Sequence, residues 1–180
     1  IMAAKIASRM NRMAPSGIRK VNEKALAMER AGERVLHFEL GRPDFDTPEY
    51  IKKAAYQALA EGKVHYTSNF GMMELRQAIA DKLKRENNVD YKATEVLVTV
   101  GLSEAVFAVL AAILEPGDEI LVPDPVWLNY INVPNLLGAK PVMYSLKEEN
   151  GFQMDLEEVR SKITDKTRAV VPVHYSGLAA

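Results

Sequence analysis

Residues 96–105 have the sequence Val96-Leu97-Val98-Thr99-Val100-Gly101-Leu102-Ser103-Glu104-Ala105, and this stretch decides the fold. A run rich in β-branched residues ends at one glycine, and a run that favours helix begins directly after it. We expect a strand over 96–100 that feeds a helix over 103–114 through a glycine turn. Backbone N–H groups at such a helix start lie at the positive end of the helix dipole, where they can bind a phosphate. On these residues alone, a phosphate site and a plain strand-to-helix turn both remain open.

The glycine turn lacks two common phosphate-binding motifs, which excludes two classes of phosphorylated ligand. It has neither the Gly-x-Gly-x-x-Gly spacing of dinucleotide folds nor the Gly-Lys-Ser/Thr of nucleoside triphosphatases. The sequence therefore indicates a different phosphorylated ligand, if it binds one.

The chain after this turn alternates between strand and helix patterns. We expect strands over 119–123, 141–145 and 169–173, and helices over 127–137 and 155–162. Before the turn, the pattern predicts a helix from Ile18 that stops at Gly32, a strand over 35–40, and helices over 47–61 and 75–87. Strands separated by helices are normally parallel and joined by right-handed crossovers. The sequence thus predicts a doubly wound α/β fold, whose ligands gather at the carboxyl ends of the strands.

Composition excludes several classes of protein. The 180 residues are 48% hydrophobic and 26% charged, with a net charge of −1, which is typical of a globular domain without nucleic acid or an anionic membrane as partner. Without cysteine there is no disulfide, thiolate nucleophile or zinc-thiolate site. The three histidines lack carboxylates at ligand spacing, so we expect no metal site. No apolar run spans a bilayer and no secretory signal is recognisable, which favours a cytoplasmic protein.

Five motifs in order along the chain resemble those of a known family. They are Gly41-Arg42-Pro43-Asp44-Phe45-Asp46-Thr47-Pro48; His65-Tyr66-Thr67 with Glu74-Leu75-Arg76; Thr99-Val100-Gly101-Leu102-Ser103-Glu104-Ala105; Pro116-Gly117-Asp118-Glu119; and Pro123-Asp124-Pro125-Val126-Trp127. Together they resemble the class I/II aminotransferases, the aspartate-aminotransferase-like enzymes of fold type I that use pyridoxal 5′-phosphate. The resemblance extends from about Pro15 to about Val173 and is specific because the order of the motifs is kept.

The resemblance implies a fold. It implies a three-layer α/β/α large domain with a mainly parallel sheet, incomplete here, preceded by an N-terminal arm. Residues 1–47 would form the arm, a helix and a segment of the small domain. Residues 48–180 would form the first part of the cofactor-binding large domain.

The resemblance also implies site residues. The amides of Gly101, Leu102 and Ser103 would hold the cofactor phosphate, and the indole of Trp127 would stack on the pyridine ring. Tyr66 would reach across a homodimer interface to the phosphate bound by the neighbouring subunit. Taken without the family, Trp127 would be a core or interface residue and Tyr66 an ordinary loop tyrosine.

Gly41 matches the family position whose backbone lies against the substrate carboxylate, where a side chain would collide with the ligand. The simpler interpretation is a glycine at the end of a strand. Arg42 stands where many family members have an acidic or small residue, and we interpret it as a surface charge.

The implied activity is transfer of an amino group between an amino acid and a 2-oxo acid. The family's Schiff-base lysine, the aspartate that pairs with the pyridine nitrogen and the arginine that binds the substrate carboxylate have no counterpart in the 180 residues, so no catalytic residue is nominated. A lyase or synthase of the same cofactor fold would share every motif. A non-catalytic, truncated fragment is a further alternative.

The match ends at the last strand. Where these aminotransferases have Asn-Pro-x-x-Pro-Thr-Gly, the chain has His174-Tyr175-Ser176-Gly177. With Val171-Pro172-Val173 before it, this segment is similar to the corresponding strand end of the nucleotide-sugar aminotransferases. A chance match and a sugar-related substrate both remain open, and the amino donor and acceptor are undecided.

Overall fold

The structure is a computed structural model that describes residues 5–180, and its contacts divide the chain into two compact units. One, which we call the sheet unit, contains residues 5–16 and 100–180 of the described chain. The other, the helical unit, is Gly17–Thr99. The predicted domain boundary between residues 47 and 48 refers to the small and large domains of the family fold. These two units do not test it, and it stays a prediction.

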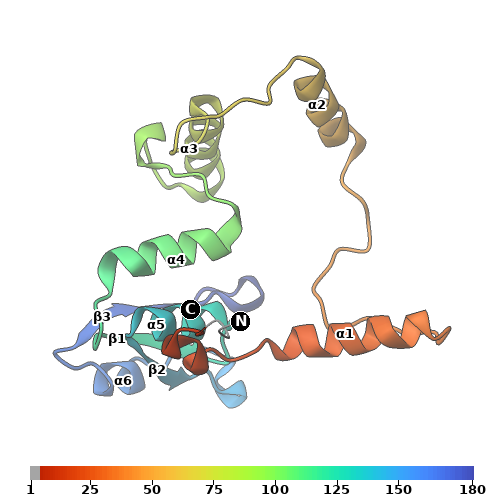
Figure 1. Cartoon of the computed structure of the whole chain (residues 1–180). Coiled ribbons are helices and arrows are strands. Elements are labelled where there is room, and N and C mark those ends of the chain that lie inside the picture. The colour runs from red at the N-terminus through yellow and green to blue at the C-terminus, as the bar shows by residue number, and fades with distance from the viewer. Residues whose placement is uncertain (1–4) are drawn as a thin grey trace. The chain divides into compact units, whose positions relative to one another are not determined.

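A parallel sheet of three strands forms the centre of the sheet unit (Figure 1). Its strands are β1 (Glu119–Asp124), β2 (Lys140–Ser145) and β3 (Thr167–Val170), in the order β2-β1-β3. Leu121 at the middle of β1 lies opposite Val142 on one side and Val170 on the other. Because β1 is paired on both edges and covered on both faces, its centre is completely buried. The parallel arrangement expected from the alternating pattern is confirmed.

Helices cover both faces of this sheet. On one face, core residues of α4 (Gly101–Ile113) and α5 (Asn129–Leu137) pack with Ile120 and Val122. On the other face, Leu121 packs with Tyr144 and with α6 (Leu156–Ser161). Successive side chains of a strand point to opposite faces, so the apolar run of β1 supplies both layers of core. The predicted three-layer architecture is confirmed, although the sheet is small.

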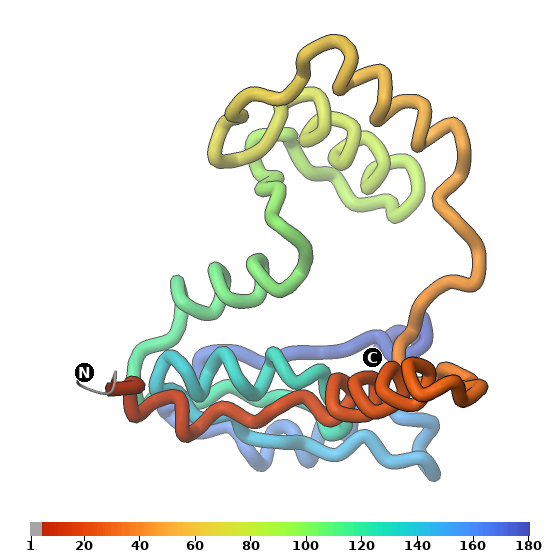
Figure 2. The backbone as a smooth tube through the Cα atoms, turned by 45° about the vertical axis from the view of Figure 1, so that its right-hand side comes forward, coloured from red at the N-terminus to blue at the C-terminus, as the bar shows by residue number. Residues whose placement is uncertain are grey.

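The N-terminal arm lies along α5, as Figure 2 shows. It contains a short 3-10 helix, η1 (Ser8–Arg12). Asn132 holds the arm in two ways, since its Nδ2 donates to the carbonyl of Ala14 and its Oδ1 accepts from the Ala14 amide, both over 3.0 Å.

The helical unit contains α1 (Gly17–Arg30), α2 (Glu49–Ala60), α3 (Met73–Asn87) and the 3-10 helix η2 (Ala93–Glu95). The buried Arg76 of α3 fixes the chain that follows, because its Nε donates to the carbonyl of Val96 over 2.9 Å. Its guanidinium carbon also lies 5.4 Å from the centre of the Phe70 ring, a cation–π arrangement.

Two expected strands are absent. Residues 35–40 and 96–100 have extended or irregular backbone, and within residues 5–180 neither pairs with a strand. The amide of Val98 donates to the Phe70 carbonyl over 3.1 Å, but this contact does not continue as a ladder. The prediction of strands over both segments was wrong, because a strand also requires a neighbour to pair with.

The starts of two helices differ in how they are capped. The carboxylate of Asp155 caps α6 by accepting from the amides of Glu157 and Glu158 over 3.0 and 3.2 Å. The N-cap of α2 is Pro48, which makes no side-chain cap hydrogen bond. The remaining 3-10 helices are η3 (Glu148–Asn150) and η4 (Tyr175–Gly177). Over residues 5–180, no helix is long and apolar enough to cross a membrane.

Candidate functional site

The glycine turn at the start of α4 has the geometry that the sequence suggested. Gly101 has φ of +71°, a conformation that residues with a Cβ rarely adopt, and a Cβ built there would meet nothing within 4 Å. The carboxylate of Glu104 accepts from the amide of Val100. The N-cap residue of α4, Val100, makes no side-chain cap hydrogen bond, and Leu102 and Ser103 in the first turn are both exposed. The turn is therefore accessible to an external acceptor.

A hydrogen bond connects the start of α4 to the start of α5. Nδ2 of Asn129 donates to Oγ of Ser103 over 3.1 Å. Asn129 lies five residues beyond Asp124, the last residue of β1. The contact thus places the glycine turn at the carboxyl end of β1, the edge where parallel α/β sheets bind ligands.

Trp127 lies in the loop between β1 and α5, at the same edge of the sheet. Its indole is 41% exposed. Its ring centre is 5.9 Å from that of Tyr130, and the two ring planes meet at 80°. The rings meet edge to face and are not stacked, so the indole retains accessible surface for another flat ring.

These residues fit the two ends of a phosphorylated aromatic cofactor. The turn offers amide N–H groups and the Ser103 hydroxyl, which are the donors that a phosphate requires. The indole offers a flat apolar surface, which a heteroaromatic ring requires. Glu104 is the acidic residue in this first helical turn, and its carboxylate accepts a hydrogen bond from the Val100 amide.

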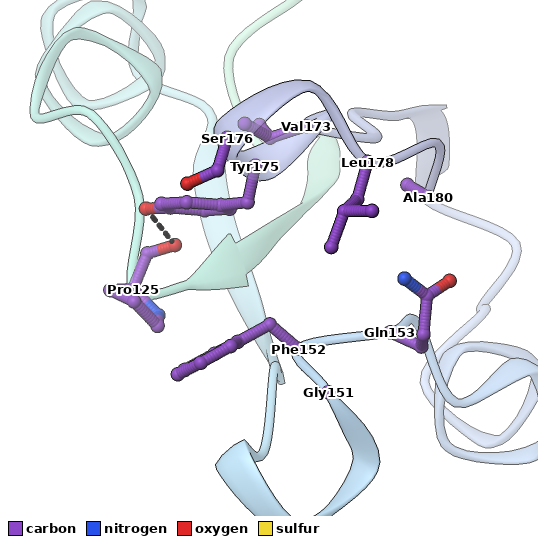
Figure 3. A pocket seen from close by; sticks show the side chains of 9 residues that line it. All are labelled: Pro125, Gly151, Phe152, Gln153, Val173, Tyr175, Ser176, Leu178 and Ala180. Atoms are coloured by element: carbon purple, nitrogen blue, oxygen red, sulfur yellow. Dashed lines mark hydrogen bonds between the residues drawn. The ribbon is translucent and has the colours of Figure 1, made fainter.

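A pocket of about 370 Å³ lies beyond the carboxyl ends of β1 and β3. Figure 3 shows Phe152 and Leu178 facing into it, with Tyr175 beside Pro125. The Tyr175 hydroxyl donates to the carbonyl of Pro125 over 2.9 Å, which ties the segment 174–177 to the chain that follows β1 (Figure 3). The segment whose sequence departs from the family pattern therefore lies at the ligand-binding edge of the sheet.

In the helical unit, Gly41 follows an extended segment that is fixed to α1 by His37. Nδ1 of His37 lies 2.7 Å from Oε1 of Glu39, and Nε2 lies 2.9 Å from Oε1 of Glu29. Hydrogen bonds that the carboxylates of Glu39 and Glu29 accept from the His37 ring raise the pKa of His37. Hydrogen bonds from Asn22 and then from His37 lower the pKa of Glu39 to about 2. The raised pKa of His37 and the lowered pKa of Glu39 both favour the ionised form of this cluster, which lies directly before Gly41.

Gly41 itself is exposed, and a Cβ built on it would meet nothing within 4 Å. Its φ lies outside the left-handed region, unlike that of Gly101. No contact within residues 5–180 therefore requires a glycine at position 41, which leaves room for an explanation through a ligand.

Tyr66 is fully exposed and lines a broad hollow of about 530 Å³ in the helical unit, together with Thr67 and Met73. Its hydroxyl has no hydrogen-bond partner within the part of the chain that the structure describes. The structure thus brings together Gly101, Ser103 and Trp127 through Asn129, while Tyr66 and Gly41 belong to the other unit.

The family model of the aminotransferases of class I and II matches residues 33–174. The chain belongs to this family. Its members are generally dependent on pyridoxal 5′-phosphate, and the matched residues include the glycine turn, Trp127, Tyr66 and Gly41.

Named relatives agree with this assignment. A probable aspartate/prephenate aminotransferase of Aquifex aeolicus is 43% identical over 92% of this chain and 42% of its own length. The aspartate/prephenate aminotransferase of Thermus thermophilus is 42% identical over 92% of this chain and 43% of its own length. The chain therefore spans about two fifths of the length of the curated relatives it matches.

Solved structures confirm the fold. The aspartate aminotransferase of Thermus thermophilus with maleate is 40% identical, has a TM-score of 0.91, and matches 97% of this chain and 46% of its own. An alanine aminotransferase from Pyrococcus furiosus is 38% identical with a TM-score of 0.86, over 92% of this chain and 43% of its own. The α/β fold of the fold-type-I aminotransferases is thereby confirmed.

Sequence reasoning missed Asn129 as a residue of this site. Its contact with Ser103 joins positions 26 apart in the chain, and no local pattern reveals such a pair. The available signal was weak: an asparagine two residues after Trp127, at the start of a helix.

Proposed function

We propose that the full-length protein carrying this chain is a pyridoxal-phosphate-dependent aminotransferase that moves an amino group between an amino acid and a 2-oxo acid. The observation that carries the proposal is the exposed first turn of α4, joined through Asn129 to the segment with Trp127, within a chain of this family. A full-length protein is here a polypeptide that contains this chain together with segments matching the rest of the relatives' length.

Each residue has one task in this proposal. The amides of Leu102 and Ser103 and the Ser103 hydroxyl bind the phosphate, and Gly101 lets the backbone turn toward it. Trp127 orients the pyridine ring by stacking. When bound, pyridoxal phosphate supplies an electron sink for bond changes at the substrate's Cα.

The helical unit supplies the other two contacts. Gly41 leaves its backbone open to the substrate carboxylate, because a side chain there would occupy that space. Tyr66 reaches the phosphate bound by the partner subunit of a homodimer, and its complete exposure within one chain agrees with this task. We propose aspartate as the first amino donor to test, because relatives at 42–43% identity are named for it.

The test uses the full-length protein, aspartate and a 2-oxo acid. We expect pyridoxal phosphate to bind and an amino group to appear on the 2-oxo acid. Trp127→Ala should weaken cofactor binding by at least about 2- to 13-fold, because it loses the roughly 0.5–1.5 kcal/mol of aromatic stacking and also the apolar contact area, while Trp127→Phe should retain most of the affinity. Release of ammonia without a new amino acid would instead indicate a lyase, and absence of cofactor binding would refute the proposal.

Gly41→Ala tests the role of Gly41 in substrate binding without a large effect on stability. A methyl group at position 41 meets no atom of residues 5–180 within 4 Å, so the thermal midpoint should remain within about 1 °C, since uncrowded surface substitutions are near neutral. The KM for the amino acid should rise by about 10-fold or more if the carboxylate lies against this backbone. An unchanged KM would remove Gly41 from the site.

A further inference from the structure

The hydroxyl of Ser103 has a defined hydrogen-bond state. A serine hydroxyl carries one proton and two lone pairs. Here Oγ accepts from Nδ2 of Asn129 over 3.1 Å, and no acceptor for its own proton is found among residues 5–180. Accepting from the amide leaves the O–H free to point away from Asn129 and toward a ligand.

The side chain of Asn129 is used for this contact and not for its own helix. Asn129 is the first residue of α5, and the N-terminus of that helix has no side-chain cap. Asparagine commonly caps a helix from the position before its first residue, which in α5 is occupied by Leu128. Asn129 lies one position further on, and its side-chain amide donates to the neighbouring helix α4.

The same turn of chain carries Trp127. The amide of Tyr130 donates to the Trp127 carbonyl over 3.0 Å, and the Tyr130 ring lies edge to face with the indole. Asn129, between them in sequence, therefore connects the hydroxyl at the glycine turn with the segment that carries the indole. A shift of Ser103 relative to Trp127 would break this hydrogen bond.

We propose that Asn129 is a positioning residue of the cofactor site, which orients the Ser103 hydroxyl so that its proton is donated to the phosphate. The inference rests on the proposed function, because the phosphate belongs to pyridoxal phosphate. Asn129 itself does not touch the cofactor; it acts through Ser103.

The experiment compares pyridoxal phosphate with pyridoxal, which lacks the phosphate. Both affinities are measured by equilibrium dialysis with the full-length apoprotein. Asn129→Ala should weaken binding of pyridoxal phosphate by about 3- to 10-fold, the range expected for one hydrogen bond, and change pyridoxal binding by less than about 2-fold. Asn132→Ala is the matched control, because Asn132 lies on the same helix and its amide holds the arm. It should leave both affinities unchanged.

Two further variants test the route through Ser103. Ser103→Ala should reproduce the selective loss for pyridoxal phosphate, and the double variant should lose no more than Ser103→Ala alone, because Asn129 acts only on that hydroxyl. Asn129→Asp should weaken binding more than Asn129→Ala. A carboxylate at position 129 accepts a hydrogen bond from the Ser103 hydroxyl, which then no longer donates to the phosphate, and its negative charge repels the phosphate.

The outcomes separate the two proposals. Equal losses for both ligands in Asn129→Ala, no loss at all, or full additivity with Ser103→Ala would overturn the role of Asn129 while leaving the cofactor assignment in place. If the unmodified protein binds neither ligand, the proposed function itself fails.

Discussion

The imidazole of His37 lies 2.7 Å from the carboxylate of Glu39, two residues further along the same extended segment. Its other nitrogen lies 2.9 Å from Glu29 of α1. Ionised carboxylates only accept hydrogen bonds, so the ring satisfies both contacts when both nitrogens carry protons. The segment before Gly41 is therefore fixed to α1 by a charged histidine.

This arrangement predicts a pH dependence. The pKa of His37 is raised, chiefly by the hydrogen bond with Glu39 and next by that with Glu29. The unfolded pKa of His37 is 6.5, and the folded pKa is higher. The stabilisation that protonated His37 contributes is therefore fully present below pH 6.5 and is lost as the pH rises through the folded pKa. Amide exchange of residues 33–40, corrected for intrinsic rates, should therefore accelerate at alkaline pH. His37→Gln should exchange rapidly at every pH, and identical profiles for the two proteins would contradict the prediction.

The sequence predicted those parts of the fold that depend on nearby residues. Helix α4 follows from the glycine turn and the alanine-rich run after it. The cap at Asp155 follows from spacing within one turn. The three parallel strands follow from short apolar runs between helices, which bury both faces of β1.

What could not be predicted depends on distant partners. The segment 96–100 has the composition of a strand, but a strand requires a neighbour, and none is present among residues 5–180. The contact of Asn129 with Ser103 and that of Asn132 with Ala14 join residues 26 and 118 positions apart. Composition and periodicity carry no information on such pairs, so the site was predicted as separate residues and not as a connected group.

Tyr144 is expected to stabilise the end of β3. Its side chain is almost completely buried, and its hydroxyl donates to the carbonyl of Val171 over 2.7 Å. Burial raises the pKa of this hydroxyl, so it remains a donor at neutral pH. Tyr144→Phe should cost about 1–2 kcal/mol, because the Val171 carbonyl loses its donor while the packing is kept. Denaturant titration of the full-length protein measures the loss, and Tyr91→Phe, at an exposed ring, should be nearly neutral.

Substitution of Gly71 is expected to be more destabilising than that of other glycines with positive φ. Gly71 has φ of +93°, and a Cβ on it would lie 2.7 Å from Cβ of Val98. Gly62 is the matched control, with φ of +74° and nothing within 4 Å of its added Cβ. Gly62→Ala should cost about 1–2 kcal/mol from backbone strain alone, and Gly71→Ala about 1–3 kcal/mol more from overpacking. Equal denaturation midpoints for the two variants would show that Val98 moves aside freely.

The cap of α6 offers a test with a conservative rescue. Asp155 accepts from two amides of a helix of six residues, so its loss affects a large part of that helix. Asp155→Ala should destabilise the protein by about 0.5–2 kcal/mol, whereas Asp155→Asn and Asp155→Ser should retain most of the stability because both can cap. The same loss in all three variants would assign the effect to charge.

The isolated 180-residue chain is expected to self-associate. An apolar groove of about 290 Å³ lies between α4 and β3, and Leu102 and Val109 within it are more than half exposed. The outer edge of β3 is unpaired among residues 5–180, and open edges recruit further strands. Val170 lies on β3, lines this groove and is 38% exposed, so Val170→Lys places a charge at the open edge.

In gel filtration with light scattering, the unmodified chain should elute as oligomers, and Val170→Lys should shift it toward monomer, because a charge on an edge strand opposes pairing. Arg168→Lys, which keeps the charge on the same strand, should leave the association unchanged. A monodisperse monomer that melts cooperatively would mean that the exposed apolar surface is closed in solution by rearrangement within the chain itself.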